Sequence, residues 1–329
     1  MDTNKIYIVV VNYNNWQDTI ECLESVFKNT YNNFQIILVE NNSSNNSLSS
    51  IMAWAEGKQA VVYSTSSQLK YLSQPFEKKP LEYVFYTEEE ALNSTKHKKE
   101  AQYENPIIII RAKNNNGFSA GSNIGMRYAI AKNDFEYIWL LNNDTVIEKS
   151  SLSLLIKYAK ENKLGLAGST LMYYYAPEKI QTYGGHINTF WGTANHIIRM
   201  EDVPKKLDYI AGASFLLKKE TIEKIGLLPE EYFLYYEETD YCFNAKKNGF
   251  KLGINIKSIV YHKEGGSTKT YGEFLTRDEF IDVLFLRNRI KFHRKYLGGG
   301  IGLWIGLLIA FIIRIKRGQA NRIYAVLRK

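Results

Sequence analysis

Cysteine is scarce in this chain of 329 residues, which contains only Cys22 and Cys242. Both lie in segments with helical spacing, and together they offer no metal-site spacing. We therefore expect a reduced, cytosolic setting for the protein. The segment Met1–Lys5 leads directly into an apolar run and has no signal-peptide character.

Acidic residues are absent between residues 283 and 329. That stretch holds eleven of the 42 lysines and arginines, whereas the other 31 are outnumbered by 34 Asp and Glu residues. The formal net charge of +8 is therefore a property of the C-terminal segment, which needs its own explanation. Simple disorder of the whole chain is excluded by an aromatic content of 14%.

The first 150 residues alternate between apolar runs and segments with helical spacing. Four runs have the composition of buried parallel strands, at 6–11, 34–39, 107–110 and 137–141. Helical spacing is found at 16–28, 48–55 and 118–131. This alternation predicts an α/β fold with a doubly wound, mostly parallel central sheet flanked by helices.

Residues 56 to about 105 interrupt the alternation, and we interpret them as an insertion at the sheet edge without chemistry of its own. Short strands are expected within it at 61–64 and 83–86. Beyond residue 150 the order changes. Helices are expected at 151–161, 220–225, 238–248 and from about 271, and strands at 164–167, 209–218 and 251–261.

A carboxylate follows directly after the fourth strand, in the run Asn142-Asn143-Asp144-Thr145. Ligands in open α/β sheets bind outside the carboxyl ends of the strands, where Asp144 is expected to lie. As a hard oxygen ligand, Asp144 suits Mg²⁺ or Mn²⁺ on a diphosphate. An equally weighted alternative is that this run caps a helix beginning near Ile147.

Three carboxylates, Glu237, Glu238 and Asp240, begin a helix after the aromatic run 232–236. A helix N-terminus stabilises each such charge by about 0.3–1 kcal/mol, so a structural role is one interpretation. The flanking aromatic residues favour a partly buried site, where a carboxylate's pKa rises and suits it to act as a base. His262 ends a strand-like run as Asp144 follows one, which makes it a candidate metal ligand. The other histidines lack that context.

Six motifs occur in a specific order, although each is weak alone. They are Asn12-Tyr13-Asn14, LVENNSSNNS (38–47), NNGFSAGSNIG (115–125), LLNNDT (140–145), GASFLLKKE (212–220) and EYFLYYEETDYC (231–242). This set resembles glycosyltransferase family 2, and within it the rhamnosyltransferase-like members, over most of residues 5–295. The resemblance implies the GT-A fold and inverting transfer of a sugar from a nucleotide diphosphate donor.

The resemblance also implies roles for individual residues. Asp144, in the run that matches the DXD motif, and His262 are the implied ligands for Mg²⁺ or Mn²⁺. Glu238 matches the catalytic base, with Glu237 and Asp240 as alternatives. The implied nucleotide-sugar-binding residues are Asn12, Tyr13, Asn14, Glu40, Asn42, Asn115, Gly117, Asn123, Asn142 and Asn143.

This sequence departs from the family pattern in its acidic residues. Asn142 stands at the first DXD position, and Asn45 stands where a second nucleotide-binding acid is frequent. Glu40 and Glu238 are each one methylene longer than the usual Asp. The resemblance divides a GT-A domain at 1–270 into a nucleotide-binding half (1–150) and an acceptor-binding half (151–270).

Residues 271–329 are predicted to form a basic and apolar helical tail. The segment 280–297 has the pattern of a basic amphipathic helix, and three glycines separate it from the uncharged segment 301–313. With 297–300 the apolar run reaches 17 residues, at the lower limit for a bilayer span. Flanking basic residues favour peripheral attachment to an anionic membrane surface. A buried C-terminal helix or a homo-oligomer interface is the alternative, and the apolar run argues against nucleic-acid binding.

These features together predict a cytoplasmic, membrane-attached enzyme of cell-surface glycan synthesis. It would transfer a sugar from a dTDP- or UDP-sugar to a lipid-linked or polysaccharide acceptor, with one base and one metal giving inversion. A sugar nucleotidyltransferase is a second hypothesis, although the loop at 12–16 lacks that class's Gly-rich basic character. A third hypothesis is a non-catalytic protein that binds sugar nucleotides or membranes.

Overall fold

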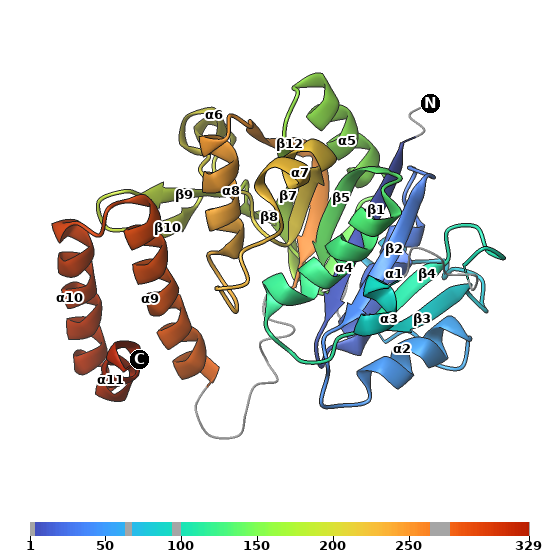
Figure 1. The fold of residues 1–329 in the computed structure, drawn as a ribbon, viewed down its shortest axis with the longest axis horizontal. Helices are drawn as coiled ribbons and strands as arrows, with labels where there is room; N and C mark the ends of the chain where they lie inside the picture. Colours follow the sequence, from blue (N-terminus) through green and yellow to red (C-terminus); the bar gives the residue numbers. More distant parts are fainter. Residues whose placement is uncertain (1–3, 63–67, 94–99, 264–276, 329) are drawn as a thin grey trace.

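The computed structural model describes residues 4–62, 68–93, 100–263 and 277–328. A ten-stranded sheet runs through it with the strand order β3-β4-β2-β1-β5-β11-β7-β12-β6, and β8 pairs with β7. Helices cover both faces of the sheet, and the C-terminal helices lie at one end of the molecule (Figure 1). The predicted α/β fold class is confirmed.

The strands and helices have the following bounds. The strands are β1 (Lys5–Asn12), β2 (Phe34–Glu40), β3 (Tyr83–Thr87), β4 (Ile107–Arg111), β5 (Phe135–Asn142), β6 (Thr145–Ile147), β7 (Leu166–Tyr173), β8 (Ala176–Thr182), β9 (Gly185–Asn188), β10 (Thr193–His196), β11 (Ser214–Lys218) and β12 (Leu252–His262). The α-helices are α1 (Trp16–Phe27), α2 (Ser47–Ala55), α3 (Glu88–Leu92), α4 (Phe118–Lys132), α5 (Ser151–Glu161), α6 (Val203–Lys206), α7 (Lys219–Ile225), α8 (Glu237–Lys247), α9 (Arg277–Tyr296), α10 (Ile301–Lys316) and α11 (Ala320–Leu327).

The strands of the N-terminal half are apolar throughout because both faces of the sheet are covered. Along β1, Ile6 and Ile8 pack into the core beneath α1, α2 and α5. Tyr7 and Val9 point the other way and pack into the core beneath α4, α7 and α8. The neighbouring strands β3, β4, β2, β1 and β5 are all parallel, so their carboxyl ends lie at one edge of the sheet.

Residues 56–105 contribute the edge strand β3, which pairs parallel with β4, followed by the short helix α3. The expected strand at 83–86 is confirmed as part of β3. The strand expected at 61–64 is wrong for residues 61 and 62, which lie in no strand, and residues 63 and 64 lie outside the described part.

The C-terminal half of the sheet is mixed rather than parallel. β11 lies antiparallel between β5 and β7, and β6 is antiparallel to β12. The strand expected at 209–218 begins only at Ser214, because Tyr209 forms an isolated bridge to Gly185 instead. The start expected near 271 for the long helix lies outside the described residues, and α9 is described from Arg277.

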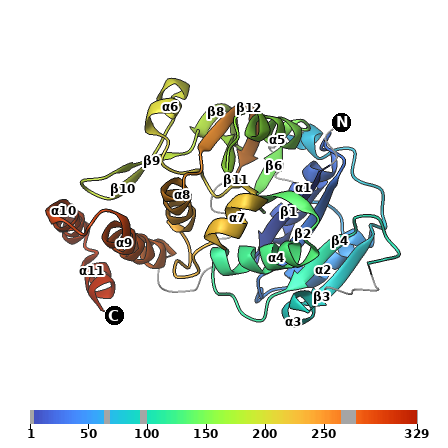
Figure 2. The ribbon, with the colours of Figure 1, turned by 45° about the horizontal axis from the view of Figure 1, so that its top comes forward.

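The C-terminal helices differ in how deeply they pack. α9 joins the main core through Phe292, whose ring centroid lies 4.9 Å from that of Phe243 in α8. α10 and α11 form a smaller cluster with α9, and α10 also contacts the β9–β10 hairpin near Phe190 and Trp191 (Figure 2). Within the described ranges, no helix combines the length and the hydropathy that a bilayer crossing requires.

Candidate functional site

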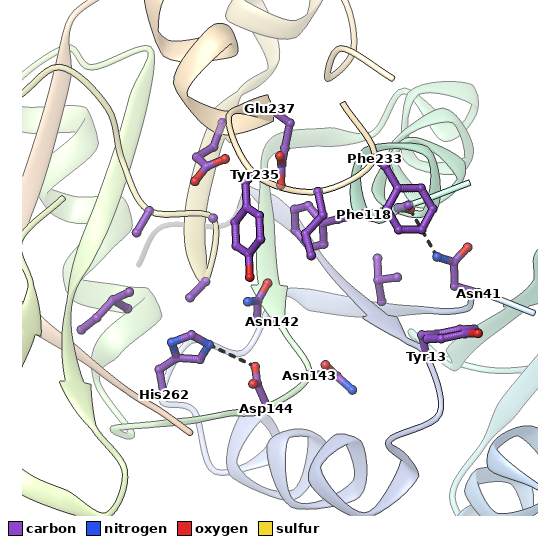
Figure 3. A pocket seen from close by; sticks show the side chains of 18 of the residues that line it. Tyr13, Asn41, Phe118, Asn142, Asn143, Asp144, Phe233, Tyr235, Glu237 and His262 are labelled. Carbon is purple, nitrogen blue, oxygen red and sulfur yellow. Dashed lines mark hydrogen bonds and ion pairs between the residues drawn. The ribbon is translucent and has the colours of Figure 1, made fainter. Parts of the chain in front are cut away.

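A pocket of about 480 Å³ opens at the carboxyl ends of the parallel strands, between them and the loop that precedes α8. Asp144 and His262 line one side and Glu237 lies on the opposite side (Figure 3), and Glu238, the next residue at the start of α8, also lines the pocket. Its lining includes the predicted residues Tyr13, Asn115, Gly117, Asn142, Asn143, Asp144, Glu237, Glu238 and His262. Residues expected from four separate motifs therefore come together at one cavity.

Asp144 and His262 form a pair at the junction of β5, β6 and β12. The Asp144 carboxylate lies 3.2 Å from His262 Nε2, and His262 Nδ1 lies 3.0 Å from Gln181 Oε1. Asp144 is buried, with 5% of its surface exposed. The helix-cap interpretation of this segment is wrong, because Thr145 begins the strand β6, which pairs with the end of β12.

The two asparagines before Asp144 are positioned by different contacts. Asn143 donates a hydrogen bond from Nδ2 to Thr19 Oγ1 in α1, at 2.9 Å. The backbone N–H of Asn142 donates to the carbonyl of Ala213, next to β11, at 3.2 Å. The turn is thus held to both halves of the molecule, while the side chains of Asn142 and Asp144 border the pocket.

Several polar side chains of the loops after β1 and β2 bind neighbouring backbone or hydroxyl groups and do not line the pocket. Asn14 accepts a hydrogen bond from Ser44 N at Oδ1 (2.9 Å), and Glu40 accepts one from Ser43 N (2.9 Å). Asn12 accepts a hydrogen bond from Thr19 Oγ1 at 2.9 Å. Four residues expected to bind the nucleotide sugar, Asn12, Asn14, Glu40 and Asn42, are therefore not among those that line the cavity.

The side chain from the second loop that does line the pocket is Asn41. Its Nδ2 donates hydrogen bonds to Asn115 Oδ1 at 3.0 Å and to the carbonyl of Gly117 at 3.2 Å. Sequence reasoning selected Asn42 instead, whose φ of 55° lies in the left-handed region shortly after β2. An Asn-Asn pair after a strand was the available signal, but it does not say which of the two faces inward.

Gly117 brings the two halves of the molecule into contact. Its φ of 95° and ψ of −175° lie in a region that is essentially restricted to glycine. A Cβ at this position would lie 2.1 Å from the carbonyl oxygen of Phe233, which also accepts a hydrogen bond from Phe118 N at 2.9 Å. The start of α4 therefore abuts the loop that leads to Glu237.

Asn123 lies outside the pocket, on the buried face of α4. It bonds the backbone of Leu228 in both directions, as donor to the carbonyl at 2.9 Å and as acceptor from the N–H at 3.0 Å. It also donates to Glu230 Oε1 at 2.8 Å. In this position Asn123 fastens α4 to the segment before the acidic cluster.

Glu237 and Glu238 face the pocket at the start of α8. Within the described residues, one carboxylate oxygen of each is buried and has no hydrogen-bond partner. Burial raises the pKa of Glu238 to about 7, and burial together with the neighbouring Glu238 charge raises the pKa of Glu237 well above its usual range. A carboxylate with a pKa near neutrality can accept a proton from a substrate hydroxyl.

Asp240 belongs to the fold rather than to the cavity. Its carboxylate accepts hydrogen bonds from Tyr232 at 2.9 Å and from Tyr296 at 2.7 Å. Lys295 lies 2.7 Å from the same group. Its oxygens are thus occupied by partners from the loop before α8 and from α9.

The pocket also contains residues that sequence reasoning did not select, including Phe233, Tyr235, Gln181 and His196. The aromatic run before Glu237 was the available signal for Phe233 and Tyr235. His196 ends the short strand β10, in a hairpin separate from the main sheet. The expectation that ligands bind at the carboxyl ends of the main strands therefore did not include it. No sequence pattern indicated Gln181, which is identified by its contact with His262 in the structure.

Asp144 and His262 suit a divalent metal whose remaining ligands come from a phosphate group. No cluster of three or more His, Cys, Asp or Glu side chains that could hold an ion occurs in the described ranges. Asp144 and His262 supply one oxygen and one nitrogen. Mg²⁺ and related ions are commonly held by one or two carboxylates with substrate phosphates supplying further oxygens, so these two residues fit such an ion.

Comparisons with known proteins give the family of the chain and several of its relatives. A model of the family described as glycosyl transferase family 2 matches residues 7–76 and 90–226. The chain is 25% identical over 187 residues to the low-salt glycan biosynthesis hexosyltransferase Agl10 of Haloferax volcanii, covering 56% of this chain and 61% of that protein. It is 24% identical over 160 residues to the dTDP-rhamnosyl transferase RfbF of Shigella flexneri, covering 46% and 51% respectively. The matches thus span about half to three fifths of these relatives.

Solved structures with the same architecture include two sugar-transfer proteins. The mannosyltransferase PcManGT from Pyrobaculum calidifontis, in complex with GDP-Man and Mn²⁺, has a TM-score of 0.53 at 11% identity, covering 99% of this chain and 75% of that chain. GalNAc-T7 with UDP, GalNAc and Mn²⁺ has a TM-score of 0.55 at 14% identity, covering 88% and 47%. At such low identity these likenesses bear on the fold, which is GT-A.

Proposed function

The chain belongs to glycosyl transferase family 2, and we propose that it is an inverting, metal-dependent glycosyltransferase. The proposed donor is a dTDP- or UDP-sugar, with rhamnose as the leading candidate because RfbF is a dTDP-rhamnosyl transferase. The proposed acceptor is a lipid-linked or polysaccharide glycan at the cell surface. In this assignment residues 1–150 bind the nucleotide and 151–270 bind the acceptor.

One observation carries the proposal: a single pocket has a carboxylate–imidazole pair on one side and two carboxylates with raised pKa on the other. A diphosphate leaving group needs positive charge beside it, whereas an acceptor hydroxyl needs a base. Placing these on opposite sides of the pocket suits a single displacement, which inverts the anomeric centre.

The chain's residues divide the reaction as follows. Glu238 accepts the proton of the acceptor hydroxyl while that oxygen attacks the anomeric carbon. The bond from this carbon to the diphosphate breaks, and the nucleoside diphosphate leaves toward Asp144 and His262. A divalent metal held there would offset the charge growing on the diphosphate, and the Mn²⁺ in the two solved neighbours supports this choice of ion.

Glu237 acts in this scheme by retaining a proton. Two adjacent buried carboxylates do not readily ionise together, so a protonated, neutral Glu237 leaves Glu238 ionised and able to act as the base. Tyr13 and Asn41, from the first two strand-end loops, border the side of the pocket where the donor nucleotide would enter.

The deciding experiment is a donor panel with the full-length protein. Calorimetric titration with UDP-glucose, UDP-galactose, dTDP-glucose and dTDP-rhamnose, each with and without Mn²⁺, should show Mn²⁺-dependent binding of one donor. Release of the nucleoside diphosphate from that donor should follow. Binding without turnover would favour a non-catalytic sugar-nucleotide-binding protein. Formation of a nucleotide sugar from a nucleoside triphosphate and a sugar phosphate would favour a nucleotidyltransferase.

We further propose that α10 attaches the protein peripherally to an anionic membrane surface. Trp304 and Leu308 lie on its outer face and are 52% and 59% exposed. Lys316 and Arg317 follow at the end of the helix and are exposed, and no acidic residue occurs beyond position 282. Such a face favours lipid headgroups of negative charge.

Vesicle sedimentation tests this attachment. The full-length protein should sediment with vesicles containing phosphatidylglycerol, and Trp304→Glu with Leu308→Glu should abolish it. Val62→Glu changes an exposed residue of the insertion and serves as the control. If the protein does not bind vesicles, and Trp304→Glu with Leu308→Glu instead converts a dimer to monomers, the face joins two copies of the chain.

A further inference from the structure

The loop that delivers Glu237 and Glu238 is held in an unusual backbone conformation. Tyr235 and Tyr236 have φ values of 70° and 73°, so two consecutive residues with large side chains occupy the left-handed region. That region is unfavourable for residues other than glycine, asparagine and aspartate. Tyr236 is the residue directly before α8, so this backbone sets the direction in which Glu237 and Glu238 leave the loop.

The group that holds this backbone comes from α9, more than 50 residues further along the chain. Asn288 donates two hydrogen bonds from Nδ2, one to the carbonyl of Leu234 at 2.8 Å and one to the carbonyl of Tyr235 at 2.9 Å. Asn288 is 3% exposed, so water cannot easily replace these bonds.

α9 is itself fixed against α8 by contacts on both sides of Asn288. Toward its C-terminal end, Lys295 and Tyr296 both bind the carboxylate of Asp240, each at 2.7 Å. On the other side of Asn288, the ring of Phe285 lies 5.3 Å from that of Tyr236. Figure 1 shows α9 running beside α8. The helix is therefore a rigid support for the loop.

We propose that Asn288 is a positioning residue for the acidic side of the pocket, and that the catalytic unit extends through α9 to about Tyr296. The positioning role of Asn288 rests on the proposed function, in which Glu238 is the base. Asn288 does not touch the pocket, and it acts by keeping Tyr235 and Tyr236 left-handed so that the two glutamates face the donor. The tail therefore divides into a helix that completes the site, α9, and helices that follow it.

Hydrogen exchange tests the loop without any substrate. Asn288→Ala in the full-length protein should raise amide exchange in peptides covering 231–242 and leave peptides covering α1 unchanged. Asn321→Ala is the matched control, since Asn321 lies in α11 and its side chain donates to Glu279 at 2.8 Å on the surface. Unchanged exchange at 231–242, or an increase that α1 shares, would overturn the proposal.

Kinetics then separate positioning from general stability. With the donor identified by the panel, Asn288→Ala should lower kcat by about 10–100-fold, the loss expected when a reacting group is misplaced by about 1 Å. The donor KM should change little, because the donor contacts lie on the Asp144 side. A matched rise in KM with unchanged kcat would contradict a positioning role. If no donor turns over, the proposed function fails, while the exchange result still decides the role of Asn288 in the loop.

A double-mutant cycle addresses the backbone directly. Asparagine tolerates the left-handed region better than phenylalanine, so Tyr235→Asn should reduce the loop's dependence on Asn288. The kcat loss from Asn288→Ala is expected to be at least about threefold smaller in the Tyr235→Asn background than in the Tyr235→Phe background. Equal losses in the two backgrounds would show that Asn288 does not act through this conformation.

Discussion

The two sides of the pocket are built in different ways. Asp144 and His262 meet because β6 and β12 pair, so ordinary strand topology brings them together. Glu237 and Glu238 follow two left-handed tyrosines in a loop held from α9. On the first side the Asp144 carboxylate and the His262 imidazole contact each other, whereas on the second side one carboxylate oxygen of each glutamate has no hydrogen-bond partner among the described residues. The regular side is suited to hold charge in place, and the irregular side is suited to move a proton.

The largest expected effect tests the acidic side by removing the base. Glu238→Gln should lower turnover of the active donor by about 10²–10⁴-fold, the usual contribution of a positioned general base. Donor affinity measured by calorimetry should be nearly unchanged, because Glu238 lies opposite the Asp144 pair. Glu231→Gln changes an exposed glutamate of the same segment, paired with Lys295, and should retain activity. Similar losses in both variants would mean that the segment's charge matters, rather than its base.

The contact between the two sides can be tested at Gly117. Gly117→Ala adds a methyl group 2.1 Å from the Phe233 carbonyl at a φ of 95°, and should lower the free energy of unfolding by on the order of 2–4 kcal/mol. Gly226→Ala is the control, because Gly226 has a φ of 83° with nothing within 4 Å of the new atom. It carries the backbone strain without the clash. Equal losses of stability in denaturant titrations would show that the approach of α4 to the Phe233 loop is not tight.

These two sides also differ in how far the sequence predicted them. Asp144 and His262 could be located because each ends or follows an apolar run, and parallel strands share one edge. The alternation of strands and helices likewise predicted the parallel half of the sheet. It could not predict that β11 inserts antiparallel between β5 and β7, because a buried apolar run has the same composition in either direction.

The acidic side was predicted as a cluster but not as a geometry. Nothing in the sequence indicates that Tyr235 and Tyr236 are left-handed, since glycine, the usual signal, is absent there. The support from Asn288 is a contact between distant segments and has no local pattern. The resemblance to glycosyltransferase family 2 is confirmed by the family match, and it supplied the residue roles that we propose and that spacing alone left open.

The regular side is tested through ligand binding. Asp144→Asn keeps the shape of the side chain and removes its charge, so Mn²⁺-dependent binding of the donor nucleotide should weaken by at least about tenfold, because the loss even of an outer-shell partner of a metal ligand costs about 10–100-fold in metal affinity. Binding measured without Mn²⁺ should be unaffected. Asp134→Asn alters an aspartate at the far end of the sheet, paired with Lys5, and serves as the control. Equal donor binding by Asp144→Asn and the wild type with Mn²⁺ would place the metal elsewhere.

The smallest expected effect concerns the pH dependence of the free energy of unfolding. It tests whether the negative charge of the acidic side destabilises the fold. The pKa of Glu238 is raised from 4.5 to about 7 in the fold, so between these values the folded state binds the proton more tightly than the unfolded state. Its contribution to stability is therefore complete below about pH 4.5 and is lost as the pH rises toward 7, and Glu237 adds in the same direction.

Glu238→Gln removes the buried charge. The difference in the free energy of unfolding between Glu238→Gln and the wild type, measured in denaturant titrations, should therefore favour the variant by on the order of 1–2 kcal/mol more at pH 8 than at pH 5. Glu231→Gln should show no such difference. If Glu238→Gln were instead equally stable relative to the wild type at both pH values, the carboxylate would be as well solvated in the fold as in water, and it would lack the raised pKa that the base role requires.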